Sequence, residues 1–153
     1  VYLWLRPVPR SVIAVAAWAA SLVAAGVLGV ASIGLLAMAA QVGPDLVLAA
    51  LAAAALATIA YVGLFVCLGL IVRRALIWGL AYLLIWEGFV ARSGTAVARL
   101  SVLVYARTIL ADVAGHTPPP LAASIPVAVI TPLAVGAVSI ALTTWWLRRT
   151  SVA

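Results

Sequence analysis

The most informative absence in this chain is that of charge. Its 153 residues include no lysine, nine arginines and only three acidic residues. Charged residues make up 8% of the chain and hydrophobic residues 68%, whereas a soluble domain carries about 25% charged residues. So few charges cannot cover a surface that faces water. The composition therefore excludes a soluble globular domain and predicts a protein whose main solvent is lipid.

Residues that support chemistry are also scarce. Cys67 is the only cysteine, which excludes an internal disulfide. Its place within an apolar run favours a small buried hydrophobic residue. The one histidine, His116, lacks the further nitrogen or sulfur ligands that a metal site needs. Ser93 has no histidine on a neighbouring span, which disfavours a serine-protease site. No G-x-x-x-x-G-K-[ST] sequence occurs, so we predict no P-loop, no catalytic residue, no metal and no directly bound cofactor.

The arginines that are present fall mostly into three close pairs at the ends of apolar runs. These pairs are Arg6 with Arg10, Arg73 with Arg74, and Arg148 with Arg149. Such a distribution is the positive-inside signal of a membrane protein, and the net charge of +6 does not form a nucleic-acid-binding patch. An even number of crossings between successive pairs places all of them on one face. We therefore expect both termini in the cytoplasm, since the inverted topology would reverse the arginine bias.

The apolar runs predict about four membrane-spanning helices, each of which needs about 20 residues. The runs cover residues 11–42, 46–72, 75–91 and 121–147. Gly43, Pro44 and Asp45 predict a turn before the second span, with Asp45 able to cap it. The third run is short, so it either thins the membrane or turns back part-way. Pro126 is expected in the first turn of the last span, and Pro132 is expected to kink that span.

Residues 92–120 are more polar and predict an external segment that contains a short interfacial or re-entrant helix. Trp145 and Trp146 precede the last arginine pair and predict an aromatic anchor at the membrane interface. We therefore expect an all-α integral membrane protein with one transmembrane region over residues 1–153. Residues 1–10 form its cytoplasmic interfacial segment.

Small residues mark the expected packing faces of the first two spans. They include Gly26, Gly29 and Gly34 in the first span and Gly63 and Gly69 in the second. Because small side chains let helix backbones approach closely, these faces predict helix–helix contacts.

Glu87 is the acidic residue at the end of the third run, and two interpretations of it remain open. An ionisable group within a span is a candidate proton or ion site. Alternatively, Glu87 lies at the outer interface, where it caps a turn or pairs with Arg92 or Arg99. Trp86 beside it then belongs to an interfacial aromatic belt.

Arg6-Pro7-Val8-Pro9-Arg10 is the most unusual polar sequence in the chain. The two prolines restrict the backbone, and the arginines flank them. The segment is either an anchor for anionic lipid or a docking surface for a cytosolic partner.

Three stretches resemble the type-2 permeases of ATP-binding-cassette transporters. Residues 2–11, YLWLRPVPRS, are similar to the cytoplasmic stretch that leads into the third span of those permeases. Residues 82–89, YLLIWEGF, resemble the end of their fifth span, and Arg99-Leu100-Ser101 with Tyr105 resembles the R-x-L-S-x-x-x-Y pattern that follows. The order and spacing align the chain with the latter two-thirds of a six-span permease. Residues 93–96, SGTA, replace the proline-glycine step of the family.

The resemblance implies a permease subunit of an ATP-driven exporter in a bacterial plasma membrane. A second permease subunit or half would face it across a substrate path, and separate ATP-binding-cassette subunits would hydrolyse ATP. It implies an ATPase-coupling segment at Arg6, Pro7, Pro9 and Arg10. It also implies an external gate or hairpin that contains Trp86, Glu87, Arg99 and Tyr105. The alternative is a non-transporting membrane assembly or regulatory subunit, with a membrane enzyme least favoured.

Overall fold

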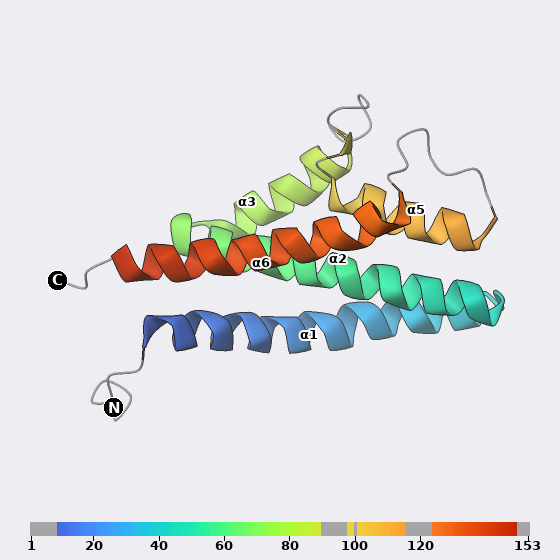
Figure 1. Cartoon of the computed structure of the whole chain (residues 1–153), viewed down its shortest axis with the longest axis horizontal. Coiled ribbons are helices and arrows are strands. Elements are labelled where there is room, and N and C mark those ends of the chain that lie inside the picture. The colour runs from blue at the N-terminus through green and yellow to red at the C-terminus, as the bar shows by residue number, and fades with distance from the viewer. Residues whose placement is uncertain (1–8, 90–97, 100, 116–123, 150–153) are drawn as a thin grey trace.

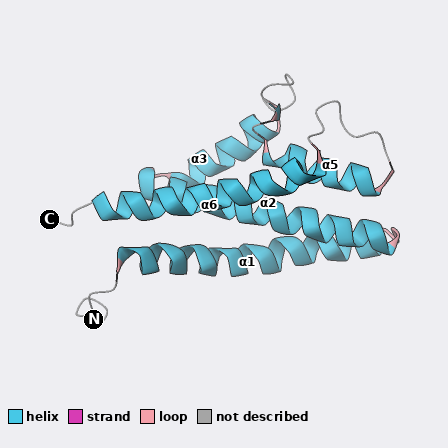
Figure 2. Cartoon of the chain, in the orientation of Figure 1, coloured by secondary structure: helices cyan, strands magenta, loops and turns pink. Residues whose placement is uncertain are grey.

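The architecture is known from a computed structural model that describes residues 9–89, 98–99, 101–115 and 124–149, with the side chains of Arg10, Arg148 and Arg149 left out. Every element within the described residues is a helix (Figures 1 and 2). The elements are α1 (Arg10–Ala39), α2 (Pro44–Ile71), α3 (Ala75–Ala81), the π-helix η2 (Tyr82–Glu87), α5 (Val102–Val113) and α6 (Ile125–Arg149). The predicted all-α class is confirmed for this part of the chain.

Three of the helices are long and apolar enough to cross a membrane, over Ser11–Ala39, Pro44–Ile71 and Ile125–Leu147. Their 29, 28 and 23 residues exceed the about 20 that a span needs, which indicates a membrane protein. The expected third span is not among them. The seven residues of α3 and the six of η2 are too few to cross about 30 Å of hydrocarbon at a rise of about 1.5 Å per residue.

The helix boundaries differ from the sequence expectation at the start of α2, including the role of Asp45, and at the end of α1. Helix α2 begins at Pro44, because a proline in the first turn of a helix loses no hydrogen bond there. Asp45 lies within that first turn and caps nothing, since Gly43 occupies the N-cap position without a side-chain bond. Helix α1 ends at Ala39, and Gln41, with φ of 53°, turns the chain towards α2.

The last helix begins at Ile125, so Pro126 lies in its first turn as expected. Pro132 lies inside α6, and the helix continues beyond it to Arg149.

Helix α2 is the centre of the molecule and packs against α1, α3, α5 and α6. Its backbone comes closest to α6, where a Cβ atom added to Gly63 would lie 3.0 Å from the Cα atom of Gly136. On the α1 side, a Cβ atom added to Gly34 would lie 2.9 Å from the side chain of Leu51. The predicted close packing is therefore confirmed at Gly34 and Gly63, whereas Gly69 faces open space.

The helix ends that adjoin the arginine pairs gather at one end of the bundle. There α1 begins, α2 ends and α6 ends (Figure 1). Arg73 and Arg74 are exposed at this end, and Trp145 and Trp146 are exposed in the last turns of α6. We call it the arginine end. The arrangement agrees with the expected placement of the pairs on one face, although Arg6 lies outside the described residues.

Two short helical pieces take the place of the expected third span. From the arginine end, α3 and η2 extend part of the way along the bundle, and α5 lies along the remaining part (Figure 1). One face of α5 packs on α2 and α6, where Tyr105 and Ile109 form a core cluster with Ala53 and Ala128. The helix expected within residues 92–120 is thus found at Val102–Val113, packed against the long helices.

Candidate functional site at the Glu87 junction

Glu87 ends the π-helix η2 and is only 5% exposed. π-Helices are rare and occur frequently at functional sites, because the extra residue per turn re-aims the side chains that follow. The turn after Glu87 brings Gly88 against the carbonyl oxygen of Leu84, and a Cβ atom at position 88 would collide with that oxygen. Glycine at this position therefore permits the wide turn that directs Glu87 into the bundle.

The Glu87 carboxylate accepts hydrogen bonds from four donors on three elements. The Tyr61 hydroxyl of α2 donates at 3.0 Å, and the Tyr82 hydroxyl of η2 donates at 3.4 Å. The Ser101 hydroxyl donates to the other carboxylate oxygen, and the Val102 backbone N–H donates at 3.1 Å. Three of the four donors share the Oε1 atom and the Ser101 hydroxyl alone contacts Oε2, so the hydrogen bonds are concentrated on one of the two carboxylate oxygens.

The last two donors belong to the N-terminus of α5. Ser101 is the N-cap residue of that helix and also accepts a hydrogen bond from the Val104 N–H at 3.4 Å. The unpaired N–H groups and the dipole at a helix N-terminus favour a negative charge. Glu87 therefore serves as a cap that joins the end of η2 to the start of α5, across 14 positions of sequence.

These contacts decide part of the question left open by the sequence. The capping role expected of Glu87 is present, but its pairing with Arg99 is not: Arg99 is exposed, and no ion pair to Glu87 occurs among the described residues. Arg92, the other expected partner, lies outside them. Neutral donors and a helix N-terminus surround this carboxylate in place of a cation.

The sequence analysis left open whether Glu87 lies within a span or at the outer interface, and in the structure its carboxylate is buried inside the helix bundle. Its partner Tyr61 is near the middle of the 28-residue helix α2, a rise of about 15 Å from the Ile71 end. A polar group at such depth needs partners within the protein, because lipid offers none. The four donors meet this requirement.

An aromatic ladder runs beside the carboxylate. Tyr61 stacks on Phe65 with ring centroids 5.9 Å apart, Phe65 meets the edge of Tyr82 at 6.3 Å, and Tyr82 stacks on Trp86 at 6.5 Å. The Nε1 atom of Trp86 is buried without a hydrogen-bond partner among the described residues. Trp86 is therefore part of the packed junction.

Tyr105 ties the other half of the expected hairpin to the same junction. Its hydroxyl donates to the Arg99 carbonyl oxygen at 2.6 Å, and its ring lies in the core between α5 and α2. The Arg99 backbone is thereby held next to α5. All four residues of the expected gate thus lie in or next to the junction, although Arg99 contributes its backbone and not its charge.

The expected coupling segment is described only at its end. Pro9 is exposed and serves as the N-cap residue of α1, where its carbonyl accepts from the Val12 N–H. Arg10 begins that helix, and Arg6 and Pro7 lie outside the described residues.

No metal or nucleophile site competes with the junction in the part of the chain that the structure describes. That part contains no group of three or more His, Cys, Asp or Glu side chains able to hold a metal ion. Cys67 is a half-buried free thiol in α2, and His116 lies outside the described residues.

Sequence reasoning missed Tyr61 as a member of the site. Its one signal was a hydroxyl group within a charge-free run, and nothing in the run indicated that Glu87, 26 positions later, would face it. Comparison with protein-family models, with curated proteins and with solved structures gives no match.

Proposed function

We propose that the chain is a membrane-spanning permease subunit of an ATP-driven exporter of the ATP-binding-cassette class. One observation carries the proposal: hydrogen bonds join the two separate stretches that resemble the family. Ser101 of the R-x-L-S sequence donates to Glu87 of the Trp-Glu pair, and Tyr105 holds the Arg99 carbonyl. Residues that act together in a family's external hairpin are expected to meet in space, and these residues do.

The arrangement of the helix ends supports the same proposal. The arginine end would face the cytoplasm of a bacterium by the positive-inside rule, with both chain termini on that side. The segment with Arg6, Pro7, Pro9 and Arg10 would then dock on separate ATPase subunits, which bind and hydrolyse ATP for the complex.

The outer face of α1 supports a second permease subunit or half as a partner. Leu28, Leu35 and Leu36 on this helix are 72%, 68% and 69% exposed, and either lipid or another helix bundle would cover them. In this proposal the substrate path lies between the two bundles, and the Glu87 junction controls its outer end.

Co-purification with an ATPase subunit tests the proposal. The chain carrying an affinity tag is expressed with a candidate ATP-binding-cassette ATPase, and both the retained ATPase and its hydrolysis rate are measured in lipid vesicles. Arg6→Ala together with Arg10→Ala is expected to reduce retention about 30-fold, since each of the two contacts at a docking surface contributes about 1 kcal/mol. Arg107→Ala, in the exposed face of α5, is the matched control.

Two outcomes contradict a transport role. Retention of the ATPase without any change in its hydrolysis rate would favour the alternative, a non-transporting assembly or regulatory subunit. Crosslinking of residues 1–10 to lipid alone would remove the coupling segment from the proposal.

A further inference from the structure

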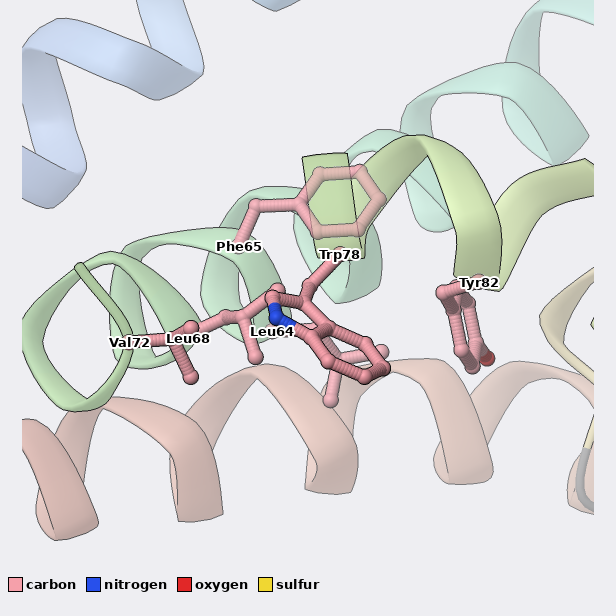
Figure 3. Close-up of a pocket in the computed structure, with 6 residues that line it drawn as sticks. All are labelled: Leu64, Phe65, Leu68, Val72, Trp78 and Tyr82. Atoms are coloured by element: carbon pink, nitrogen blue, oxygen red, sulfur yellow. The ribbon is translucent and has the colours of Figure 1, made fainter. Parts of the chain in front are cut away.

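A second feature of the molecule, separate from the Glu87 carboxylate, is an apolar pocket between α2 and α3. It has a volume of about 480 Å³, within the range of about 300–1,000 Å³ usual for small-molecule sites. Its lining consists of Leu64, Phe65 and Leu68 from α2, the C-cap residue Val72, and Trp78 and Tyr82 from the segment that follows (Figure 3). Leu64, Leu68 and Val72 are spaced four residues apart, so their side chains form one apolar stripe that runs along α2 to its C-cap.

The lining offers a ligand almost no polar partner. The Tyr82 hydroxyl points to Glu87 and is already hydrogen-bonded to it. The remaining lining groups are hydrocarbon apart from the indole N–H of Trp78, whose side chain is 61% exposed at the pocket. The shape and chemistry therefore fit a flexible hydrocarbon chain.

Two arginines lie next to one end of this pocket. Val72 is a lining residue, and Arg73 and Arg74 follow it directly in the chain. Both arginines are exposed, and neither forms an ion pair with any residue that the structure describes. They are also the only charged residues between Asp45 and Glu87. The positive charge near the pocket is therefore concentrated at its Val72 end.

We propose that this pocket binds an anionic membrane lipid, with an acyl chain along the Leu64–Val72 stripe and the headgroup at Arg73 and Arg74. The arginine end of the bundle is where the headgroups of one leaflet lie if the long helices cross the membrane, so a lipid enters without leaving its own layer. Basic residues beside a crevice between membrane helices attract anionic headgroups, whereas a neutral headgroup gains nothing from them. The inference needs the membrane placement of the helices but neither an ATPase partner nor transport.

Photo-crosslinking in vesicles tests this assignment. The whole chain is reconstituted in phosphatidylcholine vesicles that contain a small, equal fraction of either phosphatidylglycerol or phosphatidylcholine with a diazirine on the acyl chain. After illumination, mass spectrometry locates the label. Phosphatidylglycerol is expected to label residues 64–72 and 78–82 about tenfold more than phosphatidylcholine does, because two arginines near the surface favour the anionic headgroup.

Variants separate the headgroup from the chain. Arg73→Gln with Arg74→Gln is expected to reduce labelling by phosphatidylglycerol to the level of phosphatidylcholine, while the control Arg107→Gln leaves it unchanged. Leu68→Trp fills the pocket and is expected to remove the label from residues 78–82 for either lipid.

Three results would overturn the proposal. Equal labelling by the two lipids in the unmodified chain would mean ordinary contact with bulk lipid, and this comparison needs no variant to fold. Labelling that survives the loss of both arginines would remove the headgroup site. Absence of label at residues 64–72 and 78–82 with either lipid would mean that no lipid chain enters the pocket. None of these results bears on ATPase binding, so the two proposals fail independently.

Discussion

Helix α2 makes two kinds of contact, and they differ in what holds them. Towards α6 the contact is backbone against backbone, with Gly63 on Gly136. Towards η2 and α5 the contact includes hydrogen bonds to Glu87 and the aromatic ladder that begins at Tyr61, beside the apolar cluster of Tyr105 and Ile109. Close steric packing has one arrangement, whereas hydrogen bonds are exchangeable between partners. We therefore expect the α2–α6 pair to move as a unit and the Glu87 junction to be the place where the bundle rearranges.

The difference also follows from the length of the elements. Helices α2 and α6 satisfy their backbone hydrogen bonds within a full-length helix, apart from the donor that Pro132 lacks in α6, so side chains need only fit. The broken path through α3, η2 and α5 leaves a helix N-terminus inside the bundle, and a buried N-terminus requires an acceptor. Glu87 is that acceptor.

Glu87→Leu is expected to have the largest effect. It leaves the donors at Tyr61, Ser101 and Val102 buried without an acceptor, and each lost partner costs about 1–3 kcal/mol, for a total of about 4 kcal/mol. Unfolding by titration with sodium dodecyl sulfate in mixed micelles measures the loss. Asp112→Leu, at an exposed acidic residue of α5, is the matched control and should change stability by less than about 0.5 kcal/mol. A similar loss for both variants would mean that the buried network does not hold the junction.

Gly63→Leu tests the steric side of the comparison. A Cβ atom at position 63 would meet the Cα atom of Gly136 at 3.0 Å and its carbonyl oxygen at 3.3 Å, so the helix axes must separate. Overpacking of this kind costs about 1–3 kcal/mol, and the upper value is expected because both obstacles are backbone atoms.

The control for Gly63→Leu lies on the same helix. Gly69→Leu adds the same side chain where no atom lies within 4 Å, so it should be neutral or slightly stabilising by helix propensity. The same micelle titration compares the two variants. Equal stability of Gly63→Leu and Gly69→Leu would show that α2 and α6 are not in close contact.

The sequence predicts one of these two contacts better than the other. The long charge-free runs predict the three long helices, and Gly63 predicts a close contact on α2. Nothing local identifies Gly136 as its partner, because a glycine in an apolar helix does not reveal which helix it faces. A full third span is not confirmed for a related reason: apolar residues continue to Phe89, but the helix ends at Glu87, and neither the π-turn nor Gly88 has a signature in hydropathy.

For the site too, the local sequence predicts some members, and others depend on tertiary packing. The Trp-Glu and R-x-L-S stretches were singled out as candidates from the sequence, and their residues do meet. The partner on α2 was not predicted, since Tyr61 and Glu87 belong to different helices and only tertiary packing brings them within 3.0 Å. The sequence left the depth of Glu87 open, because its chain neighbours up to Phe89 are apolar and the residues from Arg92 onward are polar, whereas its partner in space, Tyr61, lies near the middle of α2.

Gly88→Ala tests whether the π-turn positions Glu87. The added methyl group would collide with the Leu84 carbonyl oxygen, and the backbone must shift to relieve the contact, at a cost of about 2 kcal/mol. Gly79→Ala, about two and a half helix turns earlier in α3, is the control, since its Cβ would lie 3.6 Å from the ring of Phe65, an ordinary contact. The shift should also expose the junction, which faster hydrogen exchange at the Val102 amide would report. Unchanged exchange in Gly88→Ala would mean that the turn adapts without moving the carboxylate.

Tyr61→Phe and Tyr82→Phe resolve the junction at the level of single hydrogen bonds and are expected to have the smallest effects. Each variant keeps its aromatic ring, so the ladder with Phe65 remains, and only one donor to Glu87 is lost. A hydrogen bond to a charged group contributes about 1.5–3 kcal/mol, so Tyr61→Phe should cost about 1.5 kcal/mol through the loss of its 3.0 Å bond. Tyr82→Phe should cost less, because its bond is 3.4 Å long and shares the oxygen atom that Tyr61 and Val102 already contact.

A comparison of Tyr61→Phe with Tyr82→Phe tests whether the bundle rearranges at the Glu87 junction. Tyr61 belongs to the α2–α6 unit and Tyr82 to the segment that includes Glu87 itself, so only the bond from Tyr61 crosses the junction. If the bundle rearranges there, Tyr61→Phe should change the rate at which the Val102 amide exchanges with solvent, and Tyr82→Phe should not. An equal effect of the two variants on exchange would place the moving boundary elsewhere and would remove the distinction between the two sides of α2.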